Sequence, residues 1–520
     1  MFSYTIDVID TTLRIFDESV PACITKTATN FLTYNSKVPG PTIRVSSGHE
    51  SIVRFTNKIG SLFPGTFSPC IENRTGRPFS VHLHGSANLA PYDGWAEDET
   101  CYGETKEYVY PNNRPTTAWY HDHAIHITAK NAYLGLAGLY LITSKTKYGG
   151  CGEPWNLEDI EEKHIIIQDK VLNSAFQLFI DPLNAHLDIS QNICKIIGTD
   201  GGFRDIPVIF PETGLLIGVA ERYDVVWDFT ALRSQTLFLW NHKDDIFMKD
   251  VPFFCYSHLI GQLQISAATN ASSPVFQENL PYTTPEDPIK RVLYASDINL
   301  AMQMANESRF HRKMAFSKIN GKWVINNETW DTFRIAAADI GQNTWELWVY
   351  QTGTGWFHPV HMHLVDFYII KREGDTGLRS FEYLSPKDVM FLGEGDRLYV
   401  IARFGAHKGD YMFHCHNLIH EDDDMMRAMR IIDSQNRLTA SSAQPFILNG
   451  FANIIYSNWK YSNPMLNDTA AKPTNQMPTL DSIYMQNMLN ISLYRIFYPF
   501  PTDSVLNGFT NPWKCAWCPA

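Results

Sequence analysis

Residues 41–57 read PTIRVSSGHESIVRFTN, two short runs of β-branched and apolar residues separated by a Ser-Ser-Gly break. Similar runs recur along the chain, for example TWELWVYQ at 344–351 and DRLYVIARF at 396–404, and Gly, Pro, Asn or Asp interrupt them. Helical periodicity is scarce before residue 435. Short strands with turn residues between them are typical of β-sandwiches. We therefore predict an all-β fold.

Two breaks in this pattern divide the chain. KTKYGGCGEPW follows Ser144, and residues 268–288 are rich in Pro, Ser and Asn, as expected of a linker. A chain of 520 residues has room for about three domains of roughly 150 residues each. The predicted divisions are sandwiches at 1–147, 148–270 and 289–435, a linker at 271–288, and an irregular C-terminal extension at 436–520.

Composition excludes some classes of partner. The formal charge is −12 and 19% of the residues are charged, without a basic stripe that would indicate nucleic acid binding. No apolar run approaches the roughly 18 residues needed to span a bilayer. We expect a monomer whose partners are small molecules.

Glycosylation sequons and cysteines favour secretion, although the N-terminal sequence lacks the apolar core of a signal peptide. If Cys415 is a metal ligand, eight cysteines remain, and the sequence does not choose among their possible pairings. Cys515 and Cys518 form a lone CxxC, which favours a disulfide staple or two thiols over zinc or thioredoxin chemistry. We expect an extracytoplasmic glycoprotein with disulfide bonds. The sequons lie at Asn73, Asn270, Asn306, Asn327, Asn467 and Asn490, and the other cysteines are Cys23, Cys70, Cys101, Cys151, Cys194 and Cys255.

Ten of the 18 histidines fall in four short clusters. One H-x-H is usually two exposed strand residues, but four such patterns in one chain point to metal binding. Residues i and i+2 of a strand share a face, so each H-x-H presents two imidazoles side by side. The four H-x-H pairs together hold eight of these imidazoles, which is more than one ion can bind. Three ions with two or three imidazoles each account for all eight. Imidazole suits copper, zinc and iron alike. The clusters are HLH at 82–84, HDH at 121–123, HPVHMH at 358–363 and HCHNLIH at 414–420.

The fourth cluster selects the metal. On a strand, Cys415 faces away from His414 and His416 and therefore reaches a second site across the backbone. Two histidines, one thiolate and a distant methionine are the ligand set of blue copper. His420 and Met425 follow Cys415 in the chain, and His358 can complete the set.

This arrangement connects two kinds of site. Short covalent paths run from Cys415 through the backbone to His414 and His416, so an electron accepted at the thiolate site can reach a multi-electron site. Clusters within 82–123 and 358–416 share ions only if the first and third domains meet. The second domain has no such cluster and would act as a spacer.

The order HxHG, HxH, HPxHxH and HCHxxxHxxxxM resembles the multicopper oxidase family of laccases, ascorbate oxidase, ferroxidases and bilirubin oxidase. HLHGS, DGWAED and HCHNLIHEDDDMM resemble the fungal bilirubin oxidase and laccase-like members, and the likeness covers roughly residues 30–430. The resemblance implies three consecutive cupredoxin-like Greek-key sandwiches. It also implies four copper ions (one type 1, one type 2 and two type 3) that couple oxidation of a small organic donor to reduction of O2 to water.

The resemblance further implies a role for each ligand. His358, Cys415, His420 and Met425 match the type 1 ligands, and His82 and His361 the type 2 pair. His84, His121 and His416 match the ligands of one type 3 copper, and His123, His363 and His414 those of the other. No ligand position is vacant, which disfavours a redox-inactive relative.

Three further residues stand out by the same resemblance. Reducing O2 consumes protons, and Asp93 and Glu421 match the acidic residues proposed to donate them; otherwise Asp93 forms a turn and Glu421 begins a solvated acidic run. Trp356 either borders the donor site or packs in the core. Methionine as the axial ligand predicts a low-to-middle potential at the type 1 site.

The electron donor is the least determined feature. Bilirubin-like tetrapyrroles, phenols and aromatic amines all remain admissible, including a role in pigment or secondary-metabolite synthesis. A metallo-oxidase acting on Cu(I) or Fe(II) is an alternative. A non-catalytic copper protein is disfavoured because storage needs no path between sites, and a copper nitrite reductase lacks the second set of clusters. The candidate methionines for a cuprous site are Met302, Met304, Met314, Met425, Met426 and Met429.

Overall fold

A computed structural model describes thirteen segments of the chain. The predicted linker 271–288 and extension 436–520 lie outside them, as do Cys515 and Cys518. The described residues are 2–13, 28–60, 77–143, 163–168, 194–211, 215–229, 232–240, 259–265, 295–330, 335–353, 356–374, 378–405 and 407–433.

Two four-stranded sheets form the first sandwich. Their inner faces share one core, in which Phe55 and Tyr108 of one sheet meet Tyr120 of the other. One sheet has the order β2-β1-β4-β6, from Thr29–Tyr34, Phe2–Leu13, Ser51–Lys58 and Thr105–Tyr110. The other has the order β3-β8-β7-β5, from Gly40–Ser46, Ala137–Thr143, Thr116–Asp122 and Val81–His84.

The middle region contributes two smaller sheets. A three-stranded sheet has the order β10-β9-β11, from Gly202–Ile209, Cys194–Thr199 and Tyr223–Trp227. A two-stranded sheet pairs β12, Thr236–Trp240, with β13, Leu259–Gln264.

The third sandwich consists of two five-stranded sheets. Its core joins Trp348 and Val400 of one sheet to Val360, Phe413 and Cys415 of the other. One sheet has the order β15-β14-β17-β21-β19, from Lys322–Ile325, Arg312–Ile319, Thr344–Thr352, Arg397–Phe404 and Phe367–Glu373. The other has the order β16-β23-β22-β18-β20, from Ile335–Gly341, Met426–Ile432, Gly409–Cys415, His358–Met362 and Val389–Leu392.

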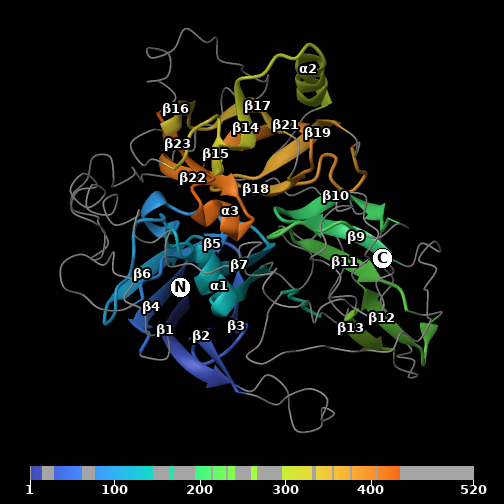
Figure 1. Cartoon of the computed structure of the whole chain (residues 1–520). Helices are drawn as coiled ribbons and strands as arrows, with labels where there is room; N and C mark the ends of the chain where they lie inside the picture. Colours follow the sequence, from blue (N-terminus) through green and yellow to red (C-terminus); the bar gives the residue numbers. More distant parts are fainter. Residues whose placement is uncertain are drawn as a thin grey trace, which may run out of the picture.

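Helices are few and short in the described part of the chain, which confirms the all-β prediction. They are η1 (Ala90–Tyr92), α1 (Thr128–Leu134), α2 (Ala295–Asn306) and α3 (Leu418–Asp422). Figure 1 shows the three groups of strands in blue, green and yellow to orange, with α3 of the third group close to α1 of the first. The carboxylate of Asp422 joins these two helices by accepting hydrogen bonds from the backbone of Thr128 and Ala129.

Cys194 is a buried free thiol, so the expectation that all eight remaining cysteines could pair is wrong. It lies in the three-stranded sheet of the middle region, at the first residue of β9. Of the six sequons, Asn306 and Asn327 are described and both side chains are exposed. Their exposure is compatible with glycosylation, which stays a prediction.

Candidate metal centre

Strand pairing brings the four histidine clusters into two ladders. β5 pairs with β7, which sets His82 opposite His121 in the first sandwich. β18 pairs with β22, which sets His361 opposite His414 in the third. All ten clustered histidines are buried. The sandwiches meet along these ladders, as the shared-ion argument required.

One group of side chains combines a thiol with two imidazoles. The Sγ of Cys415 lies 3.4 Å from Nδ1 of His358 and 3.5 Å from Nδ1 of His420, and these two nitrogens are 3.3 Å apart. An ion bound at about 2.0–2.3 Å by each ligand would give separations of about this size. A compact set of two imidazoles and one thiol is the donor set of blue copper.

Local structure holds this group in place. The side chain of Asn417 caps α3 by accepting the backbone N–H of Ile419, which starts the helix that carries His420. Met425 is fully buried in the same core as Cys415, and its carbonyl accepts the Cys415 backbone N–H at 3.1 Å. The backbone of Met425 is therefore next to that of Cys415, and its role as a ligand stays a prediction.

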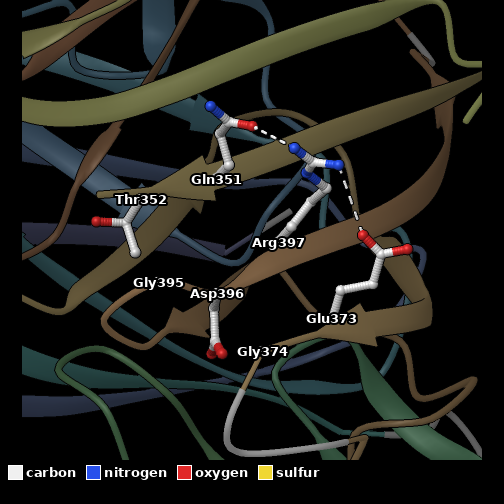
Figure 2. Close-up of a pocket in the computed structure, with 7 residues that line it drawn as sticks. All are labelled: Gln351, Thr352, Glu373, Gly374, Gly395, Asp396 and Arg397. Carbon is white, nitrogen blue, oxygen red and sulfur yellow. Dashed lines mark hydrogen bonds and ion pairs between the residues drawn. The ribbon is translucent and has the colours of Figure 1, made fainter. Parts of the chain in front are cut away.

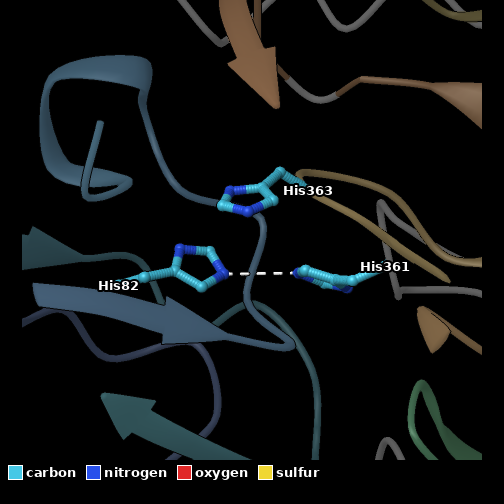
Figure 3. Close-up of side chains that lie close together, drawn as sticks. All are labelled: His82, His361 and His363. Atoms are coloured by element: carbon cyan, nitrogen blue, oxygen red, sulfur yellow. Dashed lines mark hydrogen bonds between the residues drawn. The ribbon is translucent and has the colours of Figure 1, made fainter. Parts of the chain in front are cut away.

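Eight other imidazoles form three further groups. His82 Nε2 lies 3.4 Å from His361 Nε2, and Figure 3 shows His363 beside this pair. His414 Nε2 lies 3.2 Å from His123 Nε2 and 3.1 Å from His363 Nε2. Each group has its donor atoms within 4.8 Å of one another. The groups are His82 with His361 and His363, His84 with His121 and His416, and His123 with His363 and His414.

Hydrogen bonds on the outer nitrogens show which atoms point inward. The Nδ1 atoms of His82, His121 and His361 each donate to a backbone carbonyl, which leaves their Nε2 lone pairs facing the groups. Among the described residues, Nε2 of His121 and His416 and Nδ1 of His84 have no hydrogen-bond partner. Unpaired buried nitrogens are costly unless a cation binds their lone pairs, so the arrangement fits metal ions.

The strand alternation at 414–416 appears as expected. Cys415 belongs to the group with His358 and His420, whereas its neighbours belong to two different imidazole groups. His414 joins one such group and His416 the other. Three consecutive residues therefore touch three candidate ion sites.

Both acidic candidates contact clustered histidines. Asp93 Oδ2 accepts from Nδ1 of His363 at 2.7 Å, and burial raises the pKa of this carboxyl well above its usual value. Glu421 Oε2 lies 3.0 Å from Nδ1 of His414. Burial would raise the pKa of Glu421, but the nearby His414 and His123 rings outweigh it and lower the pKa.

Two aromatic side chains cover His420. Trp323 stacks on its ring at 3.6 Å, and Trp356 meets it edge-on at 5.5 Å. Trp356 is 42% exposed, so it borders solvent and is not simply core. Trp323 was missed from the sequence because NGKW at 320–323 resembles any strand-turn-strand segment; only the fold brings it to His420.

Asp388 and the middle region were also missed. Nε2 of His84 donates to Oδ1 of Asp388 at 3.0 Å, and Arg222, from the loop before β11, binds the same carboxylate. The expectation that the second domain only spaces the other two is therefore incomplete. The sequence contains no sign of this contact, because a single arginine forms no motif with a recognisable spacing.

Two cavities differ in their relation to these groups. A cavity of about 10 Å³, room for roughly one water molecule, is lined by His82, His361 and His363. A polar cavity of about 260 Å³ lies among β17, β19 and β21, where Arg397 joins Gln351 and Glu373 (Figure 2). None of the predicted site residues lines the second cavity.

The methionines considered for a cuprous site are mostly core residues. Met304, Met314, Met426 and Met429 are buried in hydrophobic clusters. Met302 packs partly buried against the cluster around α2. In the described residues, no helix is long and apolar enough to cross a membrane.

Comparisons with known proteins point to one family. Two family models described as multicopper oxidase match residues 70–147 and 298–435. A bilirubin oxidase from Albifimbria verrucaria is 32% identical over 451 residues, which cover 76% of this chain and 72% of that protein. A laccase from Bacillus stratosphericus is 28% identical, over 78% of this chain and 91% of that one.

The fold comparison agrees with the sequence comparison. A solved structure titled multicopper oxidase from Campylobacter jejuni, a metallo-oxidase, has a TM-score of 0.60 at 19% identity and covers 82% of this chain and 91% of that chain. The cupredoxin-like sandwich architecture expected from the sequence is confirmed.

The buried imidazoles predict a pH-dependent stability of the copper-free protein. Burial lowers the pKa of His358 to about 4, whereas the unfolded ring has its usual pKa near 6.5. Since the unfolded chain then binds more protons, stability is lost as the pH falls from about 6.5 toward 4, by about 3 kcal/mol for His358 alone. Urea unfolding of metal-free protein across this range measures the effect. A flat profile would contradict buried, neutral imidazoles.

Proposed function

The chain belongs to the multicopper oxidase family, and from this premise we propose that it couples one-electron oxidation of a small aromatic donor to four-electron reduction of O2 to water. Membership of this family makes it a copper-dependent oxidoreductase that uses O2. The observation that carries the proposal is the arrangement of His414, Cys415 and His416, which belong to three different candidate ion sites.

Four copper ions would occupy the four groups. His358, Cys415, His420 and Met425 would hold type 1 copper, and the eight other imidazoles would hold the trinuclear cluster of one type 2 and two type 3 ions. Bound copper supplies single-electron exchange at the thiolate and the reduction of O2 at the cluster. Cys415 connects the two through the backbone.

Protons for the reaction would come from Asp93 and Glu421. Both carboxylates are buried, and each contacts the outer nitrogen of a different imidazole, His363 and His414. The raised pKa of Asp93 suits it to hold a proton next to the cluster, whereas the carboxylate of Glu421 would pass a proton on through His414.

The donor would dock at Trp356. This ring is exposed, and it contacts both Trp323 and His420. An aromatic donor stacked on Trp356 would be separated from the type 1 ligand His420 by this one ring. Phenols, aromatic amines and bilirubin-like tetrapyrroles share the required flat, oxidisable ring.

A metallo-oxidase is the second candidate, because the similar solved structure from Campylobacter jejuni is titled a metallo-oxidase. Of the methionines considered for Cu(I), four are buried in hydrophobic clusters, Met302 is partly buried, and Met425 is proposed as a ligand of the site with Cys415. This burial favours the organic donor. Extracytoplasmic location, glycosylation and a monomeric state remain predictions.

Replacing the thiolate tests the electron path. Cys415→Ser should abolish the intense visible copper–thiolate absorption and donor-driven O2 uptake, because serine is a poor ligand for this site. Met425→Leu is the matched control: it should keep the colour and the O2 uptake and raise the type 1 potential. Wild-type rates in Cys415→Ser would refute the path, and an unchanged potential in Met425→Leu would show that Met425 is not axial.

Oxygen-uptake assays with bilirubin, a diphenol, an aromatic amine and Fe(II) test the donor class. Organic donors should be oxidised faster than Fe(II), and Trp356→Ala should lower kcat/KM for the organic donors by about tenfold through lost ring contacts. Faster oxidation of Fe(II), with no effect of Trp356→Ala, would favour the metallo-oxidase instead.

Asp93→Asn tests the proton supply. The amide cannot release a proton, so kcat for O2 reduction should fall by about a hundredfold or more, with the copper–thiolate colour retained. Asp410→Asn is the control, because Asp410 pairs with Arg430 elsewhere in the third sandwich. A wild-type kcat and pH profile in Asp93→Asn would remove Asp93 from the proton path.

A further inference from the structure

A buried ion-pair network joins the middle region to the histidines. Nη1 and Nη2 of Arg222 donate to the two carboxylate oxygens of Asp388, the second at 2.6 Å. Oδ1 of Asp388 also accepts from Nε2 of His84 at 3.0 Å. The side chains of Arg222, Asp388 and His84 are 9%, 2% and 0% exposed. Such a bidentate arginine–carboxylate pair restricts the orientation of the carboxylate as well as its position.

His84 is held differently from its neighbours. The rings of His82, His121 and His361 donate through Nδ1 to backbone carbonyls, whereas His84 donates through Nε2 to a side chain. An ionised carboxylate only accepts, so the proton lies on Nε2 and the lone pair on Nδ1. That Nδ1 has no hydrogen-bond partner among the described residues and belongs to the group with His121 and His416. The carboxylate thus determines which atom of His84 faces the ion site.

The segment around Asp388 is itself attached to the middle region. Asp200, just after β9, accepts the backbone N–H of Arg222 at 2.7 Å and that of Val389 at 3.1 Å. Lys387 pairs with Asp200 at 2.9 Å and with Glu221 at 3.0 Å. The carbonyl of Asp388 accepts Nδ1 of His361 at 2.8 Å. Two rings from two different ion groups are therefore positioned through one residue.

Gly85 makes room for the guanidinium. Its φ is +94°, and a Cβ at this position would overlap Nη2 of Arg222. The HLHG motif therefore requires glycine at position 85 for a steric reason, which is independent of metal binding by its histidines. The first, second and third groups of strands all contribute to the contact.

We propose that Arg222 is a positioning residue for the trinuclear copper cluster, acting through Asp388 on the ring of His84. The inference rests on the proposed function, since it concerns the same cluster. The middle region, whose described residues belong to none of the ion groups, then sets the geometry of ligands in the other two. Partners of this kind affect metal affinity by about 10–100-fold.

Arg222→Lys tests this role, because lysine keeps the charge but cannot make both hydrogen bonds. Arg312→Lys is the matched control: Arg312 also binds two carboxylates, Glu346 and Asp339, within the third sandwich. Copper per chain is measured against increasing chelator, together with the copper–thiolate absorption, the near-ultraviolet absorption of the type 3 pair and the type 2 electron paramagnetic resonance signal. Circular dichroism reports folding.

In Arg222→Lys we expect the cluster to lose copper at about tenfold lower chelator concentration, with altered type 2 and type 3 signals and unchanged copper–thiolate absorption. Arg312→Lys should match the wild type in all copper signals. Asp388→Asn, which keeps the side-chain shape, should repeat the loss and serves if Arg222→Lys does not fold. Wild-type copper retention in both Arg222→Lys and Asp388→Asn, or equal loss in Arg312→Lys, would overturn the inference. A wild-type protein without copper–thiolate absorption would overturn the proposed function first.

Discussion

The burial of eight imidazoles where two β-sandwiches meet, next to a thiol and two further imidazoles buried in the third sandwich, is the constraint on which the site depends. Buried nitrogens that face one another at 3.1–3.4 Å are unfavourable without a cation between them. Burial also lowers the pKa of rings such as His121, to about 3, which keeps their lone pairs free. The contact between the sandwiches is therefore inseparable from metal binding, and copper should stabilise the assembly as well as act in it.

The geometry of β22 connects the two kinds of ion site across the contact between the sandwiches. On β22, alternation sends Cys415 into the third sandwich's core while its neighbours turn toward the first sandwich. The electron-accepting site can then lie near the surface, beside Trp356, while the O2-reducing site stays enclosed. A helix could not separate consecutive side chains onto opposite faces in this way.

Electrostatics extends the site beyond its ligands. Asp93, Glu421 and Asp388 each contact the outer nitrogen of a different ring, so the imidazoles are oriented by carboxylates as well as by backbone carbonyls. Two of these carboxylates were identifiable from local motifs, DGWAED and the residue after His420. Asp388 was not, because its importance comes from Arg222, which is 166 residues distant in the chain.

The sequence by itself determined the β-rich fold, the four histidine clusters and the opposite facing of Cys415 and its neighbours, because strand periodicity is a local property of the backbone. Only the tertiary structure decided that Trp323 covers His420, that Cys194 is a free thiol, and that Arg222 reaches Asp388. These contacts join segments far apart in the chain, and no spacing or composition encodes which distant side chains will meet once the sandwiches pack together.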